Sequence, residues 1–339
     1  MTQLFKKAAV FTDIHFGLKS NSKIHNDDCE RFVDWYIEQA KANGCEVGIF
    51  TGDWHHNRSA LNLTTMDASL RSLEKLGEAF DKFYFFPGNH DLYYKDKRDI
   101  HSVVFGKHVP GVTVITEPQV IDDVALVPWL VGEEWKQVSK MKCRYMFGHF
   151  ELPNFKMNAM VEMPDTGEIK ADDFANQEMV FTGHFHKRQQ RKNIYYIGNA
   201  FPHNYADAWD DRGMMTLEWG GEPEFIDWKD CPKYRTIPLS RLLDKTEEIL
   251  APNNLYLRVT LDIDISYEEA NFIKENFSAQ YDVREISLLP NANVDDEMNQ
   301  KEPGEIDFES VDQIVTDQIT KLDTETYKPN LLLDIYRGL

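Results

Sequence analysis

Six short apolar runs in this chain each lead into Asp, Asn or His, residues whose side chains can bind metals and transfer protons. The runs are AAVFTDIH, VGIFTGDWHH, FYFFPGNHD, YMFGHF, MVFTGHFH and YYIGNAFPH. Their content of Val, Ile, Phe and Tyr, with Gly or Pro close behind, is typical of buried strands. If these strands share a sheet, their carboxyl ends lie along one rim and the polar residues meet there. The ligand types then indicate a two-metal site for phosphoester chemistry.

The first three motifs supply donors that divalent cations accept. DIH contributes Asp13 and His15, a pairing that occurs by chance in many proteins and is weak alone. In GDWHH the glycine allows a sharp turn, and Asp53 can present one oxygen to each of two cations roughly 3.5–4 Å apart. GNHD adds Asn89, a neutral oxygen donor, and His90, which is free for proton chemistry. The signal comes from the set rather than from any single motif.

The later motifs add imidazoles. His149 ends one run, and His184 and His186 follow another. Two residues apart on an extended segment, the last two would point to opposite faces unless the chain turns, and Gly183 makes that turn plausible. Seven of the eleven histidines fall in the first five motifs. We predict structural roles for the other four, of which the last also follows a strand: His25, His101, His108 and His203.

The net charge of −20 argues against a protein that grips nucleic acid through a basic face of its own. A polyanionic substrate must then be held by local basic clusters, by metal ions or by a partner. Two clusters follow GNHD and GHFH and are expected beside the site: Lys95, Lys97 and Arg98, and Lys187, Arg188, Arg191 and Lys192. A third is expected to be solvated surface charge: Lys136, Lys140, Lys142 and Arg144.

Composition also bounds the class of protein. At 339 residues and 42% hydrophobic, the chain can bury a full core. Its four cysteines show no Cys-x-x-Cys spacing, so neither a disulfide framework nor a structural zinc site is indicated. No stretch resembles a membrane span, and too few apolar residues precede Asp13 for a secretory signal. We expect a cytoplasmic protein that is not bound to a membrane.

Hydrophobic patterning divides the chain into a large and a small folded part. Residues 1–234 alternate strands with helices over 25–44 and 61–80, then continue as strands at hairpin spacing. This predicts an α/β (α+β) fold, a mixed two-sheet sandwich flanked by helices. Residues 235–290 predict a small β-α-β capping domain, with Ser266 as a helix N-cap.

The remaining residues predict a tethered helical tail. Residues 291–306 are acidic and aperiodic and predict a flexible linker. Residues 307–339 predict helices, the first with an apolar face formed by Phe308, Val311, Ile314, Val315, Ile319 and Leu322. That face can fold back on the capping domain or dock in a groove of a partner.

The series DIH, GDWHH, GNHD, GHFEL and GHFH resembles the calcineurin-like metallophosphoesterase superfamily. Its order and spacing are similar to those of the SbcD-type double-strand-break repair nucleases. Protein phosphatases of the superfamily typically continue the second motif as GDxVDRG and close the third as GNHE, and this chain has neither feature. The short capping domain and tethered C-terminal helices also resemble the SbcD layout.

The resemblance implies a role for each site residue. The first metal would be held by Asp13, His15, Asp53 and His186. The second would be held by Asp53, Asn89, His149 and His184, with Asp53 bridging. Two Mn²⁺ ions are implied, and Mg²⁺, iron or zinc are alternatives. The implied catalytic residues are His90, His56 and Asp91.

The catalytic roles leave two alternatives open. His90 would stabilise the transition state or protonate the leaving 3′ oxygen, oriented by Asp91 or Asp13. Asp91 could equally cap a helix or turn. His56 matches a catalytic position of the family, but adjacent His55 could take that role instead.

The function that the resemblance implies is hydrolysis of DNA, as endonuclease and 3′ to 5′ exonuclease. The implied partner is an SMC-like ABC-type ATPase (SbcC-like) that binds the C-terminal helices, and a homodimer would form through residues 61–105. One alternative is a phosphatase or small cyclic-nucleotide phosphodiesterase with the same metals. Another is a non-catalytic scaffold, which is disfavoured because no expected ligand is missing.

Overall fold

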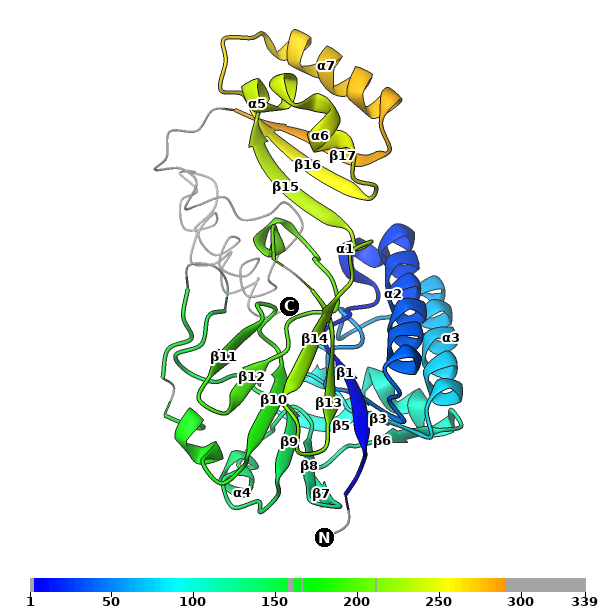
Figure 1. Cartoon of the computed structure of the whole chain (residues 1–339), viewed down its shortest axis with the longest axis vertical. Coiled ribbons are helices and arrows are strands. Elements are labelled where there is room, and N and C mark those ends of the chain that lie inside the picture. Colours follow the sequence, from blue (N-terminus) through cyan, green and yellow to red (C-terminus); the bar gives the residue numbers. More distant parts are fainter. Residues whose placement is uncertain (1–2, 158–160, 166, 211, 291–339) are drawn as a thin grey trace, which may run out of the picture. The chain divides into compact units, whose positions relative to one another are not determined.

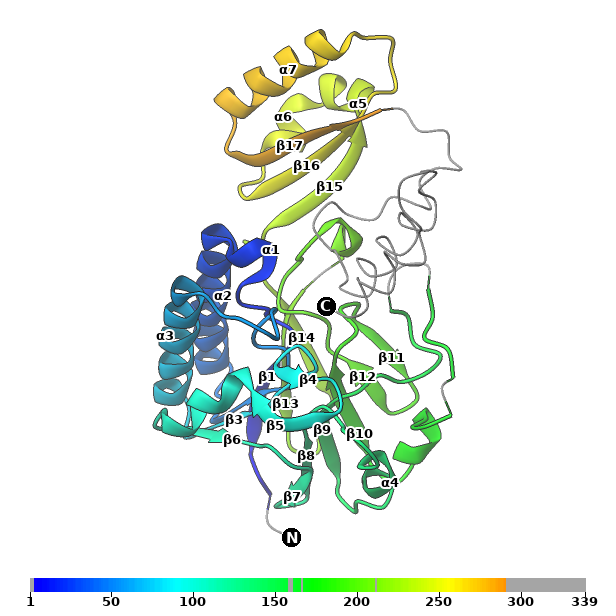
Figure 2. The same ribbon diagram turned by 180° about the vertical axis from the view of Figure 1, so that it is seen from behind.

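Two six-stranded β-sheets pack face to face in the structure, a computed structural model (Figure 1, Figure 2). It describes residues 3–157, 161–165, 167–210 and 212–290. The predicted linker (291–306) and C-terminal helices (307–339) lie outside the described residues. The prediction of a two-sheet sandwich flanked by helices is confirmed.

The first sheet carries the first three motifs at the ends of neighbouring parallel strands. Its order is β14 (Pro223–Asp227), β13 (Gly213–Glu218), β1 (Lys7–Phe11), β2 (Val47–Phe50), β3 (Lys82–Phe85) and β6 (Val112–Val114). The four strands from β1 to β6 are parallel, and β13 and β14 add an antiparallel edge. Asp13, Asp53 and Asn89 therefore leave the sheet at the same rim.

The second sheet carries the histidine motifs in the same way. Its order is β11 (Gln189–Arg191), β12 (Ile194–Tyr196), β10 (Met179–Gly183), β9 (Tyr145–His149), β8 (Val124–Val127) and β7 (Gln119–Ile121). The inner four strands are parallel, and β9 and β10 lie side by side with His149 paired to Gly183. This pairing brings GHFEL and GHFH together.

Alternating side chains of β1 explain the layering, because successive residues of a strand point to opposite faces. Ala8 and Val10 belong to the core between the sheets, whereas Ala9 and Phe11 belong to the core under the helices. The Phe11 ring lies 4.5 Å from that of Tyr36 on α2, measured between centroids. A third core covers the outer face of the second sheet.

The two predicted helices cover the outer face of the first sheet, side by side in both views (Figure 1, Figure 2). α2 (Lys23–Ala42) and α3 (Leu63–Ala79) begin at N-caps Ser22 and Asn62, whose side chains accept bonds from backbone N–H groups. The sandwich contains further short elements: α1 (Leu18–Asn21), α4 (Trp135–Val138), the hairpin β4 (Leu92–Tyr94) and β5 (Lys97–His101), and 3₁₀ turns η1 (Ser102–His108), η2 (Ala171–Phe174) and η3 (Tyr205–Asp207). Within the described part, no helix is both long and apolar enough to cross a bilayer.

The region predicted as a capping domain contains one more strand than the predicted β-α-β unit. β15 (Lys233–Pro238), β16 (Leu255–Thr260) and β17 (Val283–Leu289) form a parallel sheet, connected by α5 (Leu239–Asp244), α6 (Thr246–Leu250) and α7 (Tyr267–Gln280). Ser266 caps α7 as predicted, in a reciprocal capping box with Glu269. Arg284 of β17 donates to Asp28 of α2, with Nη2 to Oδ1 at 2.7 Å.

Candidate metal centre

The first two motif loops run in register beyond the ends of β1 and β2. The backbone N–H groups of Asp13 and His15 donate to the carbonyl oxygens of Gly52 and Asp53 at 3.0 and 3.1 Å. Asp13, His15 and Asp53 all adopt left-handed backbone, with φ of 50°, 53° and 62°. Such residues cost about 1–3 kcal/mol each and persist where the surroundings enforce them. The fold thus holds these three side chains in place at a cost in stability.

Four of the predicted residues form what we call the first ligand set: Asp13, His15, Asp53 and His186. Asp13 Oδ1 lies 3.8 Å from both His15 Nε2 and His186 Nε2. His15 Nε2 also lies 3.6 Å from Asp53 Oδ2. This nitrogen is buried and has no hydrogen-bond partner in the described structure. A buried nitrogen facing two carboxylate oxygens without bonding to them fits a site for a cation.

The second ligand set is Asp53, Asn89, His149 and His184. Asn89 Oδ1 lies 3.1 Å from His149 Nε2 and 3.0 Å from His184 Nδ1. His149 Nε2 lies 3.5 Å from Asp53 Oδ2. The structure therefore brings together all seven predicted metal ligands. It differs from the expectation that Asp53 offers one oxygen to each cation, because Oδ1 accepts the His90 N–H at 2.9 Å and Oδ2 faces both sets.

In several ligands a hydrogen bond or close contact engages one of the two polar atoms of the side chain. The other atom is then the one available to a metal. Asp13 Oδ2 accepts from the Thr12 hydroxyl at 2.6 Å. His149 Nδ1 donates to the Thr51 carbonyl at 2.8 Å. His184 Nε2 lies 3.2 Å from Glu151 Oε1. Sequence reasoning missed Glu151 as a supporting carboxylate, although it lies two residues after His149 in GHFEL.

The turn that separates His184 from His186 occurs at His184 itself, which has φ 87°. The expected pivot, Gly183, is not left-handed and serves another purpose: a Cβ there would lie 2.1 Å from Thr12 Oγ1 and 2.6 Å from Asp13 Oδ2. At Gly88 a Cβ would lie 2.1 Å from Asp53 Oδ1. Each glycine makes room for a ligand that belongs to a different motif.

The two adjacent histidines of GDWHH have different surroundings in the structure. His55 is fully buried, and its ring nitrogens lie 2.8 Å from Ser102 Oγ and 3.0 Å from Ser69 Oγ. The His56 ring stacks on that of His90 with centroids 5.2 Å apart. His56 Nδ1 lies 3.4 Å from His15 Nδ1. The structure therefore favours His56 over His55 for a role in the site.

Asp91 binds backbone rather than the His90 ring. Its Oδ2 accepts the N–H groups of Trp54 and Gly88, both at 3.0 Å. Its Oδ1 accepts the His55 N–H at 2.8 Å and the Ser102 hydroxyl at 3.1 Å. These bonds tie the GDWHH loop to the GNHD loop, so the geometry supports the turn-capping alternative over a catalytic one. The His90 ring is oriented instead by the His56 carbonyl, to which its Nδ1 donates at 2.9 Å.

Replacing Asp91 by Asn should lower the free energy of unfolding. An amide oxygen can accept only part of the four bonds, and the NH₂ group would face N–H donors, which leaves buried groups unpaired. We expect a loss of about 2–4 kcal/mol, from one or two unsatisfied groups, measured by urea unfolding. The exposed Asp81→Asn is the matched control. Unchanged stability together with an altered pH–rate profile would instead support a catalytic Asp91.

Burial and mutual proximity shape the electrostatics of the site. Burial alone raises the pKa of Asp53, but the His149 and His90 imidazoles outweigh it and hold that pKa well below its usual value. Burial lowers the pKa of His149, and the Asp53 carboxylate overcomes this and raises it to about 9. Burial, followed by the Asp53 charge, raises the pKa of Asp91 to about 7. A metal ligand must be an unprotonated imidazole, so a cation would replace the proton of His149.

Three members of the two basic clusters that follow GNHD and GHFH are paired with carboxylates. Arg98 pairs with Glu134, Arg188 Nη1 with Asp227 at 2.9 Å, and Lys187 with Asp210 at 3.8 Å.

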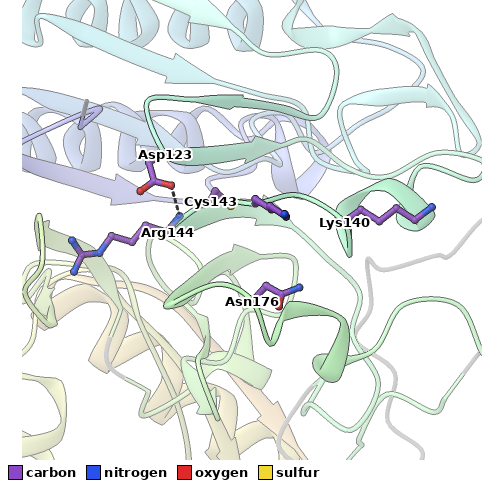
Figure 3. Close-up of a pocket in the computed structure, with 6 residues that line it drawn as sticks. Asp123, Lys140, Cys143, Arg144 and Asn176 are labelled. Atoms are coloured by element: carbon purple, nitrogen blue, oxygen red, sulfur yellow. Dashed lines mark hydrogen bonds between the residues drawn. The ribbon is translucent and has the colours of Figure 1, made fainter. Parts of the chain in front are cut away.

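The third cluster borders a surface cavity of about 670 Å³, where the Asp123 carboxylate accepts the Arg144 N–H (Figure 3). Arg144 precedes β9, and His149 ends that strand, so this cavity lies at the opposite end of β9 from the metal ligands.

Comparison with known proteins places the chain in a family. The model of the calcineurin-like phosphoesterases matches residues 6–188, more than half of the 339 residues. The chain is also similar to exonuclease subunit 1 of Enterobacteria phage T4, with 26% identity over 225 residues. The match covers 63% of this chain and 65% of that relative, so the chain spans just under two thirds of the relative's length. With the divalent-metal ligand types gathered at one rim, the chain belongs to the calcineurin-like phosphoesterase family.

Proposed function

We propose that this chain is a two-metal-dependent DNA nuclease that hydrolyses phosphodiester bonds. One observation carries the proposal: Asp53 Oδ2 lies 3.6 Å from a histidine nitrogen of the first ligand set and 3.5 Å from one of the second. A carboxylate oxygen placed between two ligand sets is what a bridged pair of cations requires. Oxygen and imidazole donors without thiolate suit Mn²⁺, with Mg²⁺, iron and zinc as competitors.

The residues of the chain have separate tasks in this mechanism. When bound, the two cations would activate a water and neutralise charge on the phosphate. His90 donates through Nδ1 to the His56 carbonyl, so the protonated ring carries its second proton on Nε2, and transfer of that proton to the leaving 3′ oxygen would leave a neutral imidazole. His56 stacks on His90 and contacts His15, so it holds the proton donor against the first ligand set.

DNA is favoured over small phosphoesters by the similarity to a phage protein named as an exonuclease subunit. The test uses the purified chain with Mn²⁺ on plasmid, on short duplex DNA and on nitrophenyl phosphate. We expect cleavage of DNA that chelation of the metal abolishes. Turnover of nitrophenyl phosphate without any DNA cleavage, even with the ATPase partner present, would instead support a phosphatase or small-molecule phosphodiesterase.

We propose further that residues 307–339 bind an SMC-like ABC-type ATPase. The relative's name describes it as a subunit, and the acidic chain leaves a partner to supply the basic DNA channel. A chain ending at Pro290 retains the complete metal centre and all cores described above. It should therefore bind metal like the full chain and fail to co-purify with the ATPase. Unchanged association would contradict the assignment of the tail.

We also propose a homodimer formed through residues 61–105 and a cytoplasmic location. Leu63 on α3 is 83% exposed, and Tyr93, Ile100 and Val104 are about half exposed. Exposed apolar side chains within this stretch of the chain support an interface between two copies. The four cysteines are all free and buried, which agrees with a reducing compartment. Analytical ultracentrifugation of the purified chain would measure the oligomeric state.

A further inference from the structure

His203 lies beside the first ligand set and is not a member of it. Its side chain is buried, and neither ring nitrogen has a hydrogen-bond partner in the described structure. Its ring centroid lies 5.3 Å from that of His15 and 5.4 Å from that of His186. One ring nitrogen from each of the three lies within 4.8 Å of the others. A neutral imidazole carries one donor and one acceptor, and burying both unpaired is costly.

The loop that carries His203 is held against the metal-binding loops. The Asn199 N–H donates to the His186 carbonyl at 3.2 Å, and the Ala200 N–H donates to the Asp13 carbonyl at 3.4 Å. The His203 N–H donates to Asp207 Oδ2 at 3.0 Å. The same Asp207 oxygen lies 4.0 Å from His186 Nδ1. The backbone that carries His203 is therefore tied to the loops that present the ligands.

A neighbouring histidine shows what a structural role looks like here. His25 is also buried, and its ring lies 5.4 Å from that of His203. Its Nε2 bonds to the His15 carbonyl at 3.0 Å, so His25 has an ordinary protein partner. The two rings are neighbours, but only the unpaired one has a ring nitrogen grouped with a ring nitrogen of His15 and one of His186.

We propose that His203 is an additional ligand of the first cation, together with Asp13, His15, Asp53 and His186. This inference rests on the two-metal site proposed above. Three imidazoles and two carboxylates would surround the first position, whereas two imidazoles, an amide and a carboxylate surround the second. The nitrogen-rich first position would favour iron or zinc over Mg²⁺. The metal bond would also satisfy a ring nitrogen that the protein leaves unpaired.

His203→Phe tests this inference, because phenylalanine keeps a planar ring and removes both nitrogens. In the metal-free protein the variant should be at least as stable as wild type, since two unpaired polar atoms are lost. On adding Mn²⁺ its rise in Tm should be smaller, and the dissociation constant of the first cation should increase by at least about tenfold. The matched control is His101→Phe. His101 is buried with an unpaired ring nitrogen and belongs to no metal-ligand group among the described residues.

The outcomes separate this inference from the proposed function. A wild-type chain that binds no metal by equilibrium dialysis would overturn both. A His203→Phe chain that binds two cations as tightly as wild type would overturn only the role of His203. Anomalous diffraction from a Mn²⁺-soaked crystal gives a direct readout even if the variant does not fold. A His203 nitrogen within about 2.4 Å of the first cation supports the proposal, and one beyond about 3 Å overturns it.

Discussion

His90→Ala should reduce DNA cleavage by about two to four orders of magnitude, as expected for loss of a general acid. Both metals should still bind. The bond that supports Asp53 comes from the backbone N–H of residue 90, at 2.9 Å from Oδ1, and alanine retains that group. The lost group is the imidazole that the His56 carbonyl orients. Single-turnover cleavage with Mn²⁺ and metal content by mass spectrometry measure the two effects separately.

The exposed His108→Ala is the matched control for His90→Ala and should cleave DNA at the wild-type rate. If His90 acts on protons and does not bind metal, His90→Ala must lose activity and keep its metal content. If His90→Ala lost metal in proportion to activity, His90 would belong with the ligands. If cleavage were unaffected, another group would have to protonate the leaving oxygen.

Asp53→Asn should remove both cations and with them all cleavage. The substitution keeps the shape of the side chain, and its amide oxygen can still accept the His90 N–H. It removes the negative charge that faces His15 and His149 from Oδ2. Loss of a bridging ligand should weaken metal binding by more than about 100-fold, the upper effect of removing only a supporting residue. Isothermal titration with Mn²⁺ measures the change.

The pKa of His149 should also change in the metal-free Asp53→Asn chain. In the wild type the Asp53 carboxylate overcomes burial and raises the pKa of His149 to about 9. Without that carboxylate the pKa of His149 should fall, because only the weaker effects of the Asp13 carboxylate and the Thr51 carbonyl then oppose burial, and NMR titration would follow the change. Asp81→Asn should change neither metal affinity nor this titration. Retention of one tightly bound cation in Asp53→Asn would show that Asp53 does not bridge.

The ligand residues were predictable because each follows a strand directly. A run of Val, Ile, Phe and Tyr identifies the strand, and parallel pairing then places all the strand ends on one rim. Asp13 and His149 are 136 positions apart in sequence, and the strand pattern alone predicted that they share a site. The helices α2 and α3 were predictable for a related reason, since their apolar periodicity and polar N-caps are local signals.

Features that depend on contacts between loops could not be predicted. Which Asp53 oxygen faces the metals is decided by the His90 N–H, and the role of Asp91 is decided by where the Trp54 and Gly88 N–H groups lie. The hydrogen bonds of His55 to Ser69 and Ser102 likewise could not be predicted from the sequence. The strand β15 was missed because KYRTIP spans the predicted boundary at residue 235 and has no clean alternation of apolar and polar residues.

The close packing at Gly88 and Gly183 has a consequence for how the motifs can change. A side chain at Gly88 would collide with Asp53, and one at Gly183 would collide with Thr12 and Asp13. A substitution at either glycine therefore displaces a ligand that lies more than thirty positions away in the sequence. Chimeras that exchange a single motif with a distant homologue should fail more often than chimeras that exchange interlocking pairs, so these segments are expected to be inherited together.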